Sequence, residues 1–254
     1  LLQWGYKITI NKQRTLKENR MEKIILSPPF SNLKILSPPK ATRVLGTYTL
    51  ERRRGLWRVL TTLKKIEGGW VNNVGLRNGG VETAPNSKNI ISVSVFDQSE
   101  WEPIITELKK KDNILGVEVN ISCPNAQVKS IPSESLSELK ECFEHVIVKT
   151  PHFASLCFYL RLIDLGVDTL HISNTRPSER GGVSGASLVL RNLKKIKEVK
   201  SFRPHVKVIG GGGIYDLETL LRYEDAGADH LSLSTILLSP LKARKIVNQY
   251  YALG

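Results

Sequence analysis

Short apolar segments alternate with longer amphipathic segments along most of this 254-residue chain. Short runs rich in Val and Ile are typical of strands, and the amphipathic segments predict helices. We expect strands over Lys23–Leu26, Thr42–Thr49, Ile90–Phe96, Leu115–Ile121, His145–Lys149, Val167–Ser173, Val206–Gly210 and Asp229–Ser234. We expect helices over Glu100–Lys111, Ser133–Glu144, Phe153–Leu165, Ser187–Lys200, Asp216–Ala226 and Pro240–Tyr251. Because strands that alternate with helices form parallel sheets, this pattern predicts an α/β fold of one domain, a (β/α)8 TIM barrel; a doubly wound open sheet is the alternative.

The first twenty residues differ from the rest of the chain. They are basic and polar, and the only methionine is Met21. They lack the apolar core and the small-residue cleavage site of a secretory signal. We therefore expect residues 1–20 to form a basic extension outside the fold, and residues 21–254 to form the barrel domain. A native start at Met21 with sequence appended upstream, or a fragment or processed chain, would explain this segment.

The composition narrows the class of protein. Lys and Arg number 37 against 24 acidic residues, giving a net charge of +13. This balance favours anionic partners such as phosphate-bearing cofactors, nucleic acid or an acidic membrane surface, without choosing among them. Three cysteines without metal-ligand spacing indicate a reducing, cytoplasmic location and argue against disulfides and iron–sulfur sites. No apolar run is long enough to predict a transmembrane segment, and the five histidines lack the spacing of a zinc helix, so we expect no metal.

Polar residues and glycines follow the ends of several predicted strands. These are Asn120, Lys149, Ser173-Asn174-Thr175, Gly181–Gly185, Gly210–Gly213 and Ser234-Thr235. In a TIM barrel the carboxyl ends of the strands form the active-site face. Two Gly-rich turns, each expected to open a helix, predict a phosphate held by backbone N–H groups. Neither turn matches the dinucleotide fingerprint or the Walker sequence.

A thiol lies between two carboxamides in the stretch from Asn120 to Asn125. The alternation over Leu115–Ile121 predicts a strand with one buried face, and Pro124 biases Cys123 towards an extended conformation at the strand end. The carboxamides can donate hydrogen bonds to, and accept them from, the amide groups of a planar ring. The thiol could be a base, a nucleophile or an apolar filler, and this setting favours chemistry.

Together, these motifs resemble the dihydroorotate dehydrogenase family of FMN-dependent barrels. The resemblance rests on Gly46–Thr49, Val71–Gly79, Asn120–Asn125, Val148-Lys149, Ser173–Thr175, Gly181–Gly185 and Gly210–Ile214, in that order along the chain. The soluble class, which uses a cysteine base, is the most similar. The resemblance implies a flavoprotein that oxidises dihydroorotate to orotate in pyrimidine biosynthesis, with FMN as its cofactor.

The resemblance also implies roles for individual residues. Cys123 matches the base that removes a proton from the substrate, and Lys149 matches the lysine beside the pyrimidine ring of the flavin. The residues that match substrate contacts are Asn72, Gly75, Leu76, Asn120, Asn125, Asn174 and Thr175. The residues that match FMN contacts are Gly46, Thr47, Asn120, Lys149, Ser173, Gly185, Gly212, Gly213, Ser234 and Thr235.

The chain departs from the family at one charged position. The family carries a second lysine, which falls where Gly46 stands, and Lys34 or Lys40 could replace it. The electron acceptor could be fumarate, quinone or a separate subunit, and the soluble class suggests a homodimer. The alternatives are an FMN barrel that acts on another dihydropyrimidine or enone, and a barrel that binds nucleotide or nucleic acid without redox chemistry; nucleic acid is the less favoured partner.

Overall fold

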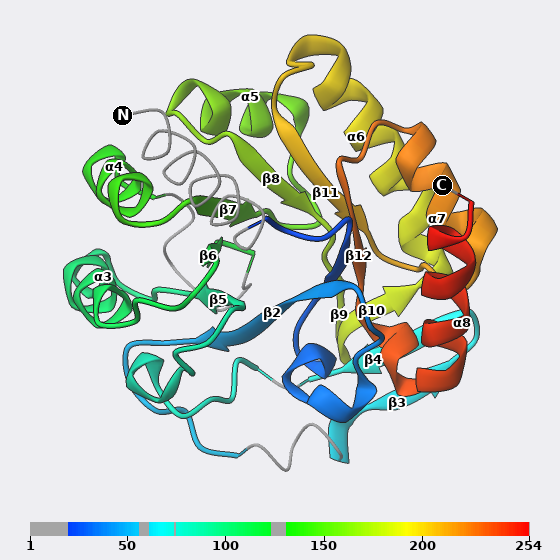
Figure 1. Cartoon of the computed structure of the whole chain (residues 1–254), viewed down its shortest axis with the longest axis horizontal. Coiled ribbons are helices and arrows are strands. Elements are labelled where there is room, and N and C mark those ends of the chain that lie inside the picture. Colours follow the sequence, from blue (N-terminus) through cyan, green and yellow to red (C-terminus); the bar gives the residue numbers. More distant parts are fainter. Residues whose placement is uncertain (1–19, 56–60, 74, 123–130, 254) are drawn as a thin grey trace, which may run out of the picture.

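Eight parallel strands form a closed barrel (Figure 1) in a computed structural model that describes residues 20–55, 61–73, 75–122 and 131–253. The first nineteen residues, most of the predicted extension, lie outside this description. The strands follow one another round the barrel as β1 (Ile24–Leu26), β2 (Ala41–Tyr48), β5 (Ile90–Val93), β6 (Gly116–Asn120), β7 (His145–Lys149), β8 (Thr169–Ile172), β11 (Lys207–Gly211) and β12 (His230–Leu233). The predicted TIM barrel is confirmed.

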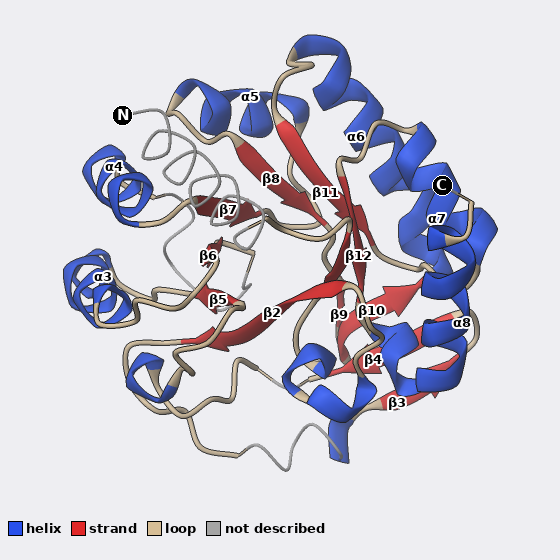
Figure 2. Cartoon of the chain, in the orientation of Figure 1, coloured by secondary structure: helices blue, strands red, loops and turns tan. Residues whose placement is uncertain are grey.

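Helices surround the barrel (Figure 2). They are α3 (Trp101–Lys109), α4 (Ser133–Cys142), α5 (Leu156–Asp164), α6 (Val189–Phe202), α7 (Leu217–Asp225) and α8 (Pro240–Tyr251). The side chain of Asp216 caps the start of α7 by accepting a hydrogen bond from Thr219 N at 2.7 Å. Gly166 and Gly227 follow α5 and α7 with positive φ, so they end these helices as the sequence predicts.

A second, four-stranded sheet lies beside the barrel, and the sequence did not predict it. Its order is β3 (Lys64–Ile66), β4 (Gly69–Asn72), β10 (Gly181–Gly185) and β9 (Arg176–Ser178). The expectation that Gly181–Gly185 opens a helix is wrong, because these residues pair antiparallel with β4 and a 3-10 turn separates them from α6. A Cβ on Gly185 would lie 2.1 Å from the carbonyl oxygen of Gly68, so only glycine allows this approach of the two strands.

Side chains inside the barrel form an apolar layer at one level and a polar layer above it. The apolar layer is the cluster of Met21, Ile25, Val44, Ile90, Ile147 and Ile209. The alternating residues Val117 and Val119 of β6 instead join the larger core that includes the helices, while Glu118 is fully buried. The prediction that this strand buries one face is therefore wrong: both of its faces are buried, and its polar side chains point into the barrel.

The polar layer is a continuous chain of hydrogen bonds centred on Glu118. The hydroxyl of Ser92 donates to Glu118 Oε1 at 2.7 Å, and His171 Nδ1 lies 2.6 Å from Glu118 Oε2. On the other side of the ring, His171 Nε2 lies 3.0 Å from Ser232 Oγ, which lies 2.7 Å from Ser27 Oγ. Each of these groups therefore has a partner away from water, which a buried carboxylate requires.

The same contacts set the protonation states. Burial acts to raise the pKa of Glu118, but the charge of Lys149 and the contact with His171 outweigh it and lower the pKa to about 2. Burial lowers the pKa of His171 below its usual range, and Lys149 adds to this effect while Glu118 opposes it. The pair therefore consists of an ionised carboxylate and a neutral imidazole at neutral pH.

Acid should destabilise the fold through this pair. Below pH 6.5, the ordinary pKa of histidine, unfolded His171 binds a proton that the buried ring does not, so the free energy of unfolding falls by up to about 1.4 kcal/mol per pH unit. Below the ordinary value of 4.5 for Glu118, the stability that its depressed pKa contributes is lost as well, down to about pH 2. Urea unfolding at a series of pH values should show a shallower slope between about pH 6 and 5 for His171→Gln than for the parent. The control is His205→Gln, since His205 is exposed; an unchanged slope in His171→Gln would contradict the assignment of a neutral buried ring.

Candidate functional site

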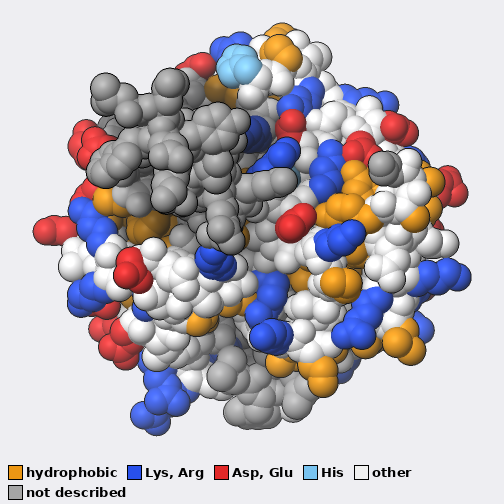
Figure 3. Space-filling model, in the orientation of Figure 1, with side chains coloured by type: hydrophobic (Ala, Val, Ile, Leu, Met, Phe, Trp, Pro, Cys, Tyr) orange, Lys and Arg blue, Asp and Glu red, His pale blue; other side chains and the backbone are white. Residues whose placement is uncertain are grey.

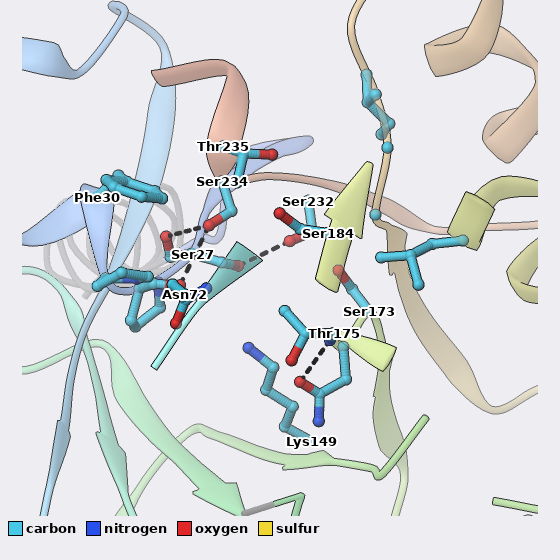
Figure 4. Close-up of a pocket in the computed structure, with 17 residues that line it drawn as sticks. Ser27, Phe30, Asn72, Lys149, Ser173, Thr175, Ser184, Ser232, Ser234 and Thr235 are labelled. Carbon is cyan, nitrogen blue, oxygen red and sulfur yellow. Dashed lines mark hydrogen bonds between the residues drawn. The ribbon is translucent and has the colours of Figure 1, made fainter. Parts of the chain in front are cut away.

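A cavity opens at the carboxyl ends of five barrel strands and is closed on one side by the second sheet (Figure 4). The strands are β1, β7, β8, β11 and β12, so the cavity lies at the end of the barrel where the sequence predicts the site. Its lining consists of Ser27, Pro28, Pro29, Phe30, Asn72, Lys149, Ser173, Asn174, Thr175, Ser184, Leu188, Gly212, Gly213, Ile214, Ser232, Ser234 and Thr235. The second sheet contributes Asn72 at the end of β4 and Ser184 on β10.

Lys149 brings a positive charge into this cavity. It ends β7, pairs in register with Asn120 of β6 and His171 of β8, and is only 9% exposed. Within the described part of the chain, no hydrogen bond or ion pair engages its amine, which points into the cavity in Figure 4. A buried cation whose donors are free is suited to a ligand that is anionic or becomes so.

The turn after β11 presents backbone to the cavity. Gly212 and Gly213 have φ angles of +95° and +77°, and a Cβ on Gly213 would lie 2.4 Å from the carbonyl oxygen of Gly185. Helices α6 and α7 hold the turn, because Asn192 donates to Gly211 O at 2.8 Å and Tyr223 donates to Gly212 O at 2.7 Å. Exposed backbone of this kind can hold a phosphate.

The structure divides the predicted site residues into three groups. Those that line the cavity are Asn72, Lys149, Ser173, Asn174, Thr175, Gly212, Gly213, Ser234 and Thr235. Those that do not appear in its lining are Gly46, Thr47, Gly75, Leu76, Asn120 and Gly185. Cys123 and Asn125 lie outside the described residues, as does Val74 between Asn73 and Gly75.

Asn120 is engaged by protein partners. Its Nδ2 donates to Thr47 Oγ1 at 2.9 Å, and its Oδ1 accepts from Ser122 N at 3.1 Å and from the Ser122 hydroxyl. Thr47 Oγ1 in turn lies 3.1 Å from Ser92 Oγ, so Asn120 joins the polar layer of the barrel. Its amide holds the chain immediately before Cys123.

The backbone at Gly46 leaves no room for a side chain. Gly46 has a φ of +121°, and a Cβ there would lie 2.5 Å from the carbonyl oxygen of Ser92. Asn32 bonds both the N–H and the carbonyl of Gly46, at 2.9 and 2.8 Å. Lys34 and Lys40, the suggested replacements for the family's second lysine, are exposed and do not line the cavity.

Sequence reasoning missed part of the lining, including Ser27, Ser184 and Ser232. A signal existed for Ser232, because alternate residues of a strand share a face and Ser234 was already predicted to be in the site. The first strand was too short to show which of its residues point inwards. Ser184 belongs to the sheet that was taken for a helix start.

Charged side chains are dispersed over the described surface. Figure 3 shows Lys and Arg spread over one face of the molecule, as expected for solvated helix surfaces. Among the described residues, no helix is long and apolar enough to cross a membrane. The same residues contain no group of three or more potential metal ligands.

Comparison with known proteins shows which proteins this chain is similar to. Protein-family models give no match. The catalytic subunit of dihydroorotate dehydrogenase B (NAD(+)) is 27% identical over 222 residues, which cover 73% of this chain and 72% of the relative, in Bacillus cereus strain AH187, in Bacillus anthracis strain A0248 and in Bacillus thuringiensis subsp. konkukian. Among solved structures, DHODH from Eimeria tenella in complex with ferulenol superposes with a TM-score of 0.60 at 16% identity, covering 83% of this chain and 74% of that one, which supports the fold.

These names agree with the expectation of a dihydroorotate dehydrogenase-like oxidoreductase. The identity is low, at 27%. The resemblance that the motifs predicted is confirmed: the chain is similar, at low identity, to the dihydroorotate dehydrogenases.

Proposed function

We propose that this chain is an FMN-dependent oxidoreductase that oxidises dihydroorotate to orotate in pyrimidine biosynthesis. The observation that carries the proposal is the buried amine of Lys149, which has no hydrogen-bond or ion-pair partner among the described residues and shares one cavity with the glycine turn at Gly212 and Gly213. A cation and a phosphate-compatible turn, joined by polar walls, match the two ends of FMN.

The residues present fit FMN as a ligand. Backbone at Gly212, Gly213 and Thr235 would hold the phosphate, since both glycines lack the Cβ that would crowd the turn. Lys149 and Ser173 would lie beside the ring system. When bound, FMN supplies the acceptor for the hydride that the substrate loses.

Lys149 would stabilise the negative charge that develops next to it during hydride transfer. Its surroundings are fixed before the reaction, because β7 is held on both sides by β6 and β8 and the charge is largely shielded from water. Charges fixed in such a site stabilise a transition state more than mobile ones in water do. The carboxylate of Glu118 interacts with Lys149 from below and balances it.

The substrate would form hydrogen bonds with Asn72, Asn174 and Thr175. Asn174 Oδ1 accepts from Thr175 N at 2.8 Å, which orients the amide, while its Nδ2 makes only a long 3.5 Å contact with Thr150 O. The amide therefore keeps donor capacity for a substrate carbonyl or carboxylate. Cys123 would be the base on the ground of resemblance, and Asn120 would position the segment that carries it.

A separate subunit would receive the electrons. The curated relatives are named catalytic subunits of an NAD(+)-linked enzyme, a name that implies further subunits in those proteins. We therefore favour a partner subunit over fumarate or quinone as the immediate acceptor, and we retain the cytoplasmic location indicated by the cysteine count.

Replacing Lys149 should slow the half-reaction. In Lys149→Gln, the rate of flavin bleaching after anaerobic mixing with dihydroorotate should fall by about 100-fold, because one fixed charge is lost at the reacting centre. Stopped-flow absorbance would measure this rate. Lys34→Gln and Lys40→Gln are matched controls and should keep the parent rate; a Lys149→Gln rate within about threefold of the parent would refute the role of Lys149.

Replacing the base should abolish the same reaction. Cys123→Ala should bind FMN as the parent does and yet show no bleaching with dihydroorotate, because no other group is assigned to accept the proton. If the parent itself binds FMN and is not bleached, dihydroorotate is the wrong substrate.

Replacing one glycine should weaken FMN binding specifically. Gly213→Ala and Gly166→Ala carry similar backbone strain, with φ angles of +77° and +96°, but only Gly213→Ala creates a contact with backbone. Titration followed by flavin fluorescence should show at least about tenfold weaker binding for Gly213→Ala and no change for Gly166→Ala. Equal affinities in the two variants would remove the turn from the FMN site.

A further inference from the structure

The hydroxyls of Ser27, Ser184, Ser232 and Ser234 line one wall of the cavity, and each already has an acceptor for its proton (Figure 4). The hydroxyl of Ser184 donates to Trp70 O at 3.2 Å. The hydroxyl of Ser234 donates to the carbonyl oxygens of Ser27 and Pro28, both at 3.2 Å. A hydroxyl whose proton is used in this way offers only lone pairs to a ligand.

The remaining two hydroxyls, of Ser27 and Ser232, are oriented by the buried pair below them. An ionised Glu118 only accepts hydrogen bonds, so the 2.6 Å contact requires the proton to be on His171 Nδ1. The other ring nitrogen of a neutral imidazole is then an acceptor, and Ser232 must donate to it across 3.0 Å. The proton in the 2.7 Å contact between Ser232 and Ser27 must therefore come from Ser27.

The direction of the hydrogen bonds from Ser27 through Ser232 to His171 depends on a neutral His171. The charged side chains that act on it are Glu118 on β6 and Lys149 on β7, and the ring is fully buried between them. A second proton on the fully buried ring would put another positive charge beside Lys149, where solvent cannot screen it. The neutral form, with its proton facing the carboxylate, is the one that satisfies every group.

We propose that this serine wall, formed by Ser27, Ser184, Ser232 and Ser234, presents only hydrogen-bond acceptors to the cavity and binds a polyhydroxyl chain. Glu118 and His171 are positioning residues, because they fix the direction of the hydrogen bonds made by Ser27 and Ser232. Several acceptors in one wall suit several hydroxyl donors in series. The same lone pairs repel phosphate oxygens, which leaves the phosphate to the backbone at Gly212 and Gly213. The identification of that chain with the ribityl group of FMN rests on the proposed function.

The orientation can be tested without any ligand. Nitrogen-15 NMR of the histidine rings in the purified protein, assigned by comparison with His171→Gln, should show His171 protonated at Nδ1 and bare at Nε2. The pattern should persist from about pH 8 to pH 6, because the ring stays neutral in that range. A proton on Nε2, or a ring that becomes doubly protonated in that range, would overturn the acceptor wall.

Ligand binding tests the second half of the proposal. Riboflavin and lumiflavin share the ring system, but lumiflavin lacks the hydroxyl-bearing chain. The parent should bind riboflavin at least about fivefold more tightly than lumiflavin, and Ser27→Ala should reduce that preference by about fivefold, the value of one hydrogen bond. Ser201→Ala is the matched control, since its hydroxyl also donates to a backbone carbonyl but lies on the surface.

The outcomes separate this proposal from the proposed function. A parent that binds both flavins equally would overturn the polyhydroxyl assignment while leaving FMN as the cofactor. If neither flavin binds, the proposed function fails, and the NMR result alone decides whether the wall consists of acceptors. An unchanged preference in Ser27→Ala would remove Ser27 from the ligand contact.

Discussion

The contact between Glu118 and His171 is the constraint on which the barrel interior depends. A carboxylate with no exposed surface is tolerated only where its charge is balanced and its oxygens are bonded, and here Ser92, His171 and Lys149 do both. The apolar layer, formed by residues such as Ile147 and Ile209, requires only that its side chains fill the space inside the barrel. The polar layer requires hydrogen bonds of fixed length and direction. This requirement extends to the cavity, because Ser27 and Ser232 belong to the same chain of hydrogen bonds.

Much of the barrel could be predicted because its strands and helices have different periodicities. The predicted bounds of β7 and α8 match the structure, and the other strands differ by a few residues at their ends. The second sheet could not be predicted in this way. Its strands β9 and β10 consist of glycines, a proline, polar residues and a single valine, so they carry no apolar pattern. The pairing of β10 depends on close approach of its backbone to the distant β4.

The site was predictable where residues follow the ends of clear strands, as Lys149 and Asn174 do. It was not predictable where the role of a residue depends on whether its side chain points into the barrel or away from it. The alternation around Glu118 predicts that its side chain faces solvent, because alternation alone cannot distinguish solvent from a polar barrel interior. The sequence pattern assigns no role to His171, and only the closed barrel brings it between Glu118 and Ser232. Asn120 was expected at the ligand, but Thr47 and Ser122 use its amide.

The absence of a lysine at Gly46 has a consequence for the chemistry of the cavity. The backbone there excludes any side chain, and both Lys34 and Lys40 are exposed, so Lys149 is the only lysine among the described lining residues. A cavity with one cation and one buried anion beneath it is close to neutral before a ligand binds. Such a site would hold an uncharged ring with little electrostatic cost and would gain stability as negative charge develops beside Lys149. A second lysine would strengthen ground-state binding of anions instead, so its absence from the described lining is compatible with the proposed oxidoreductase activity.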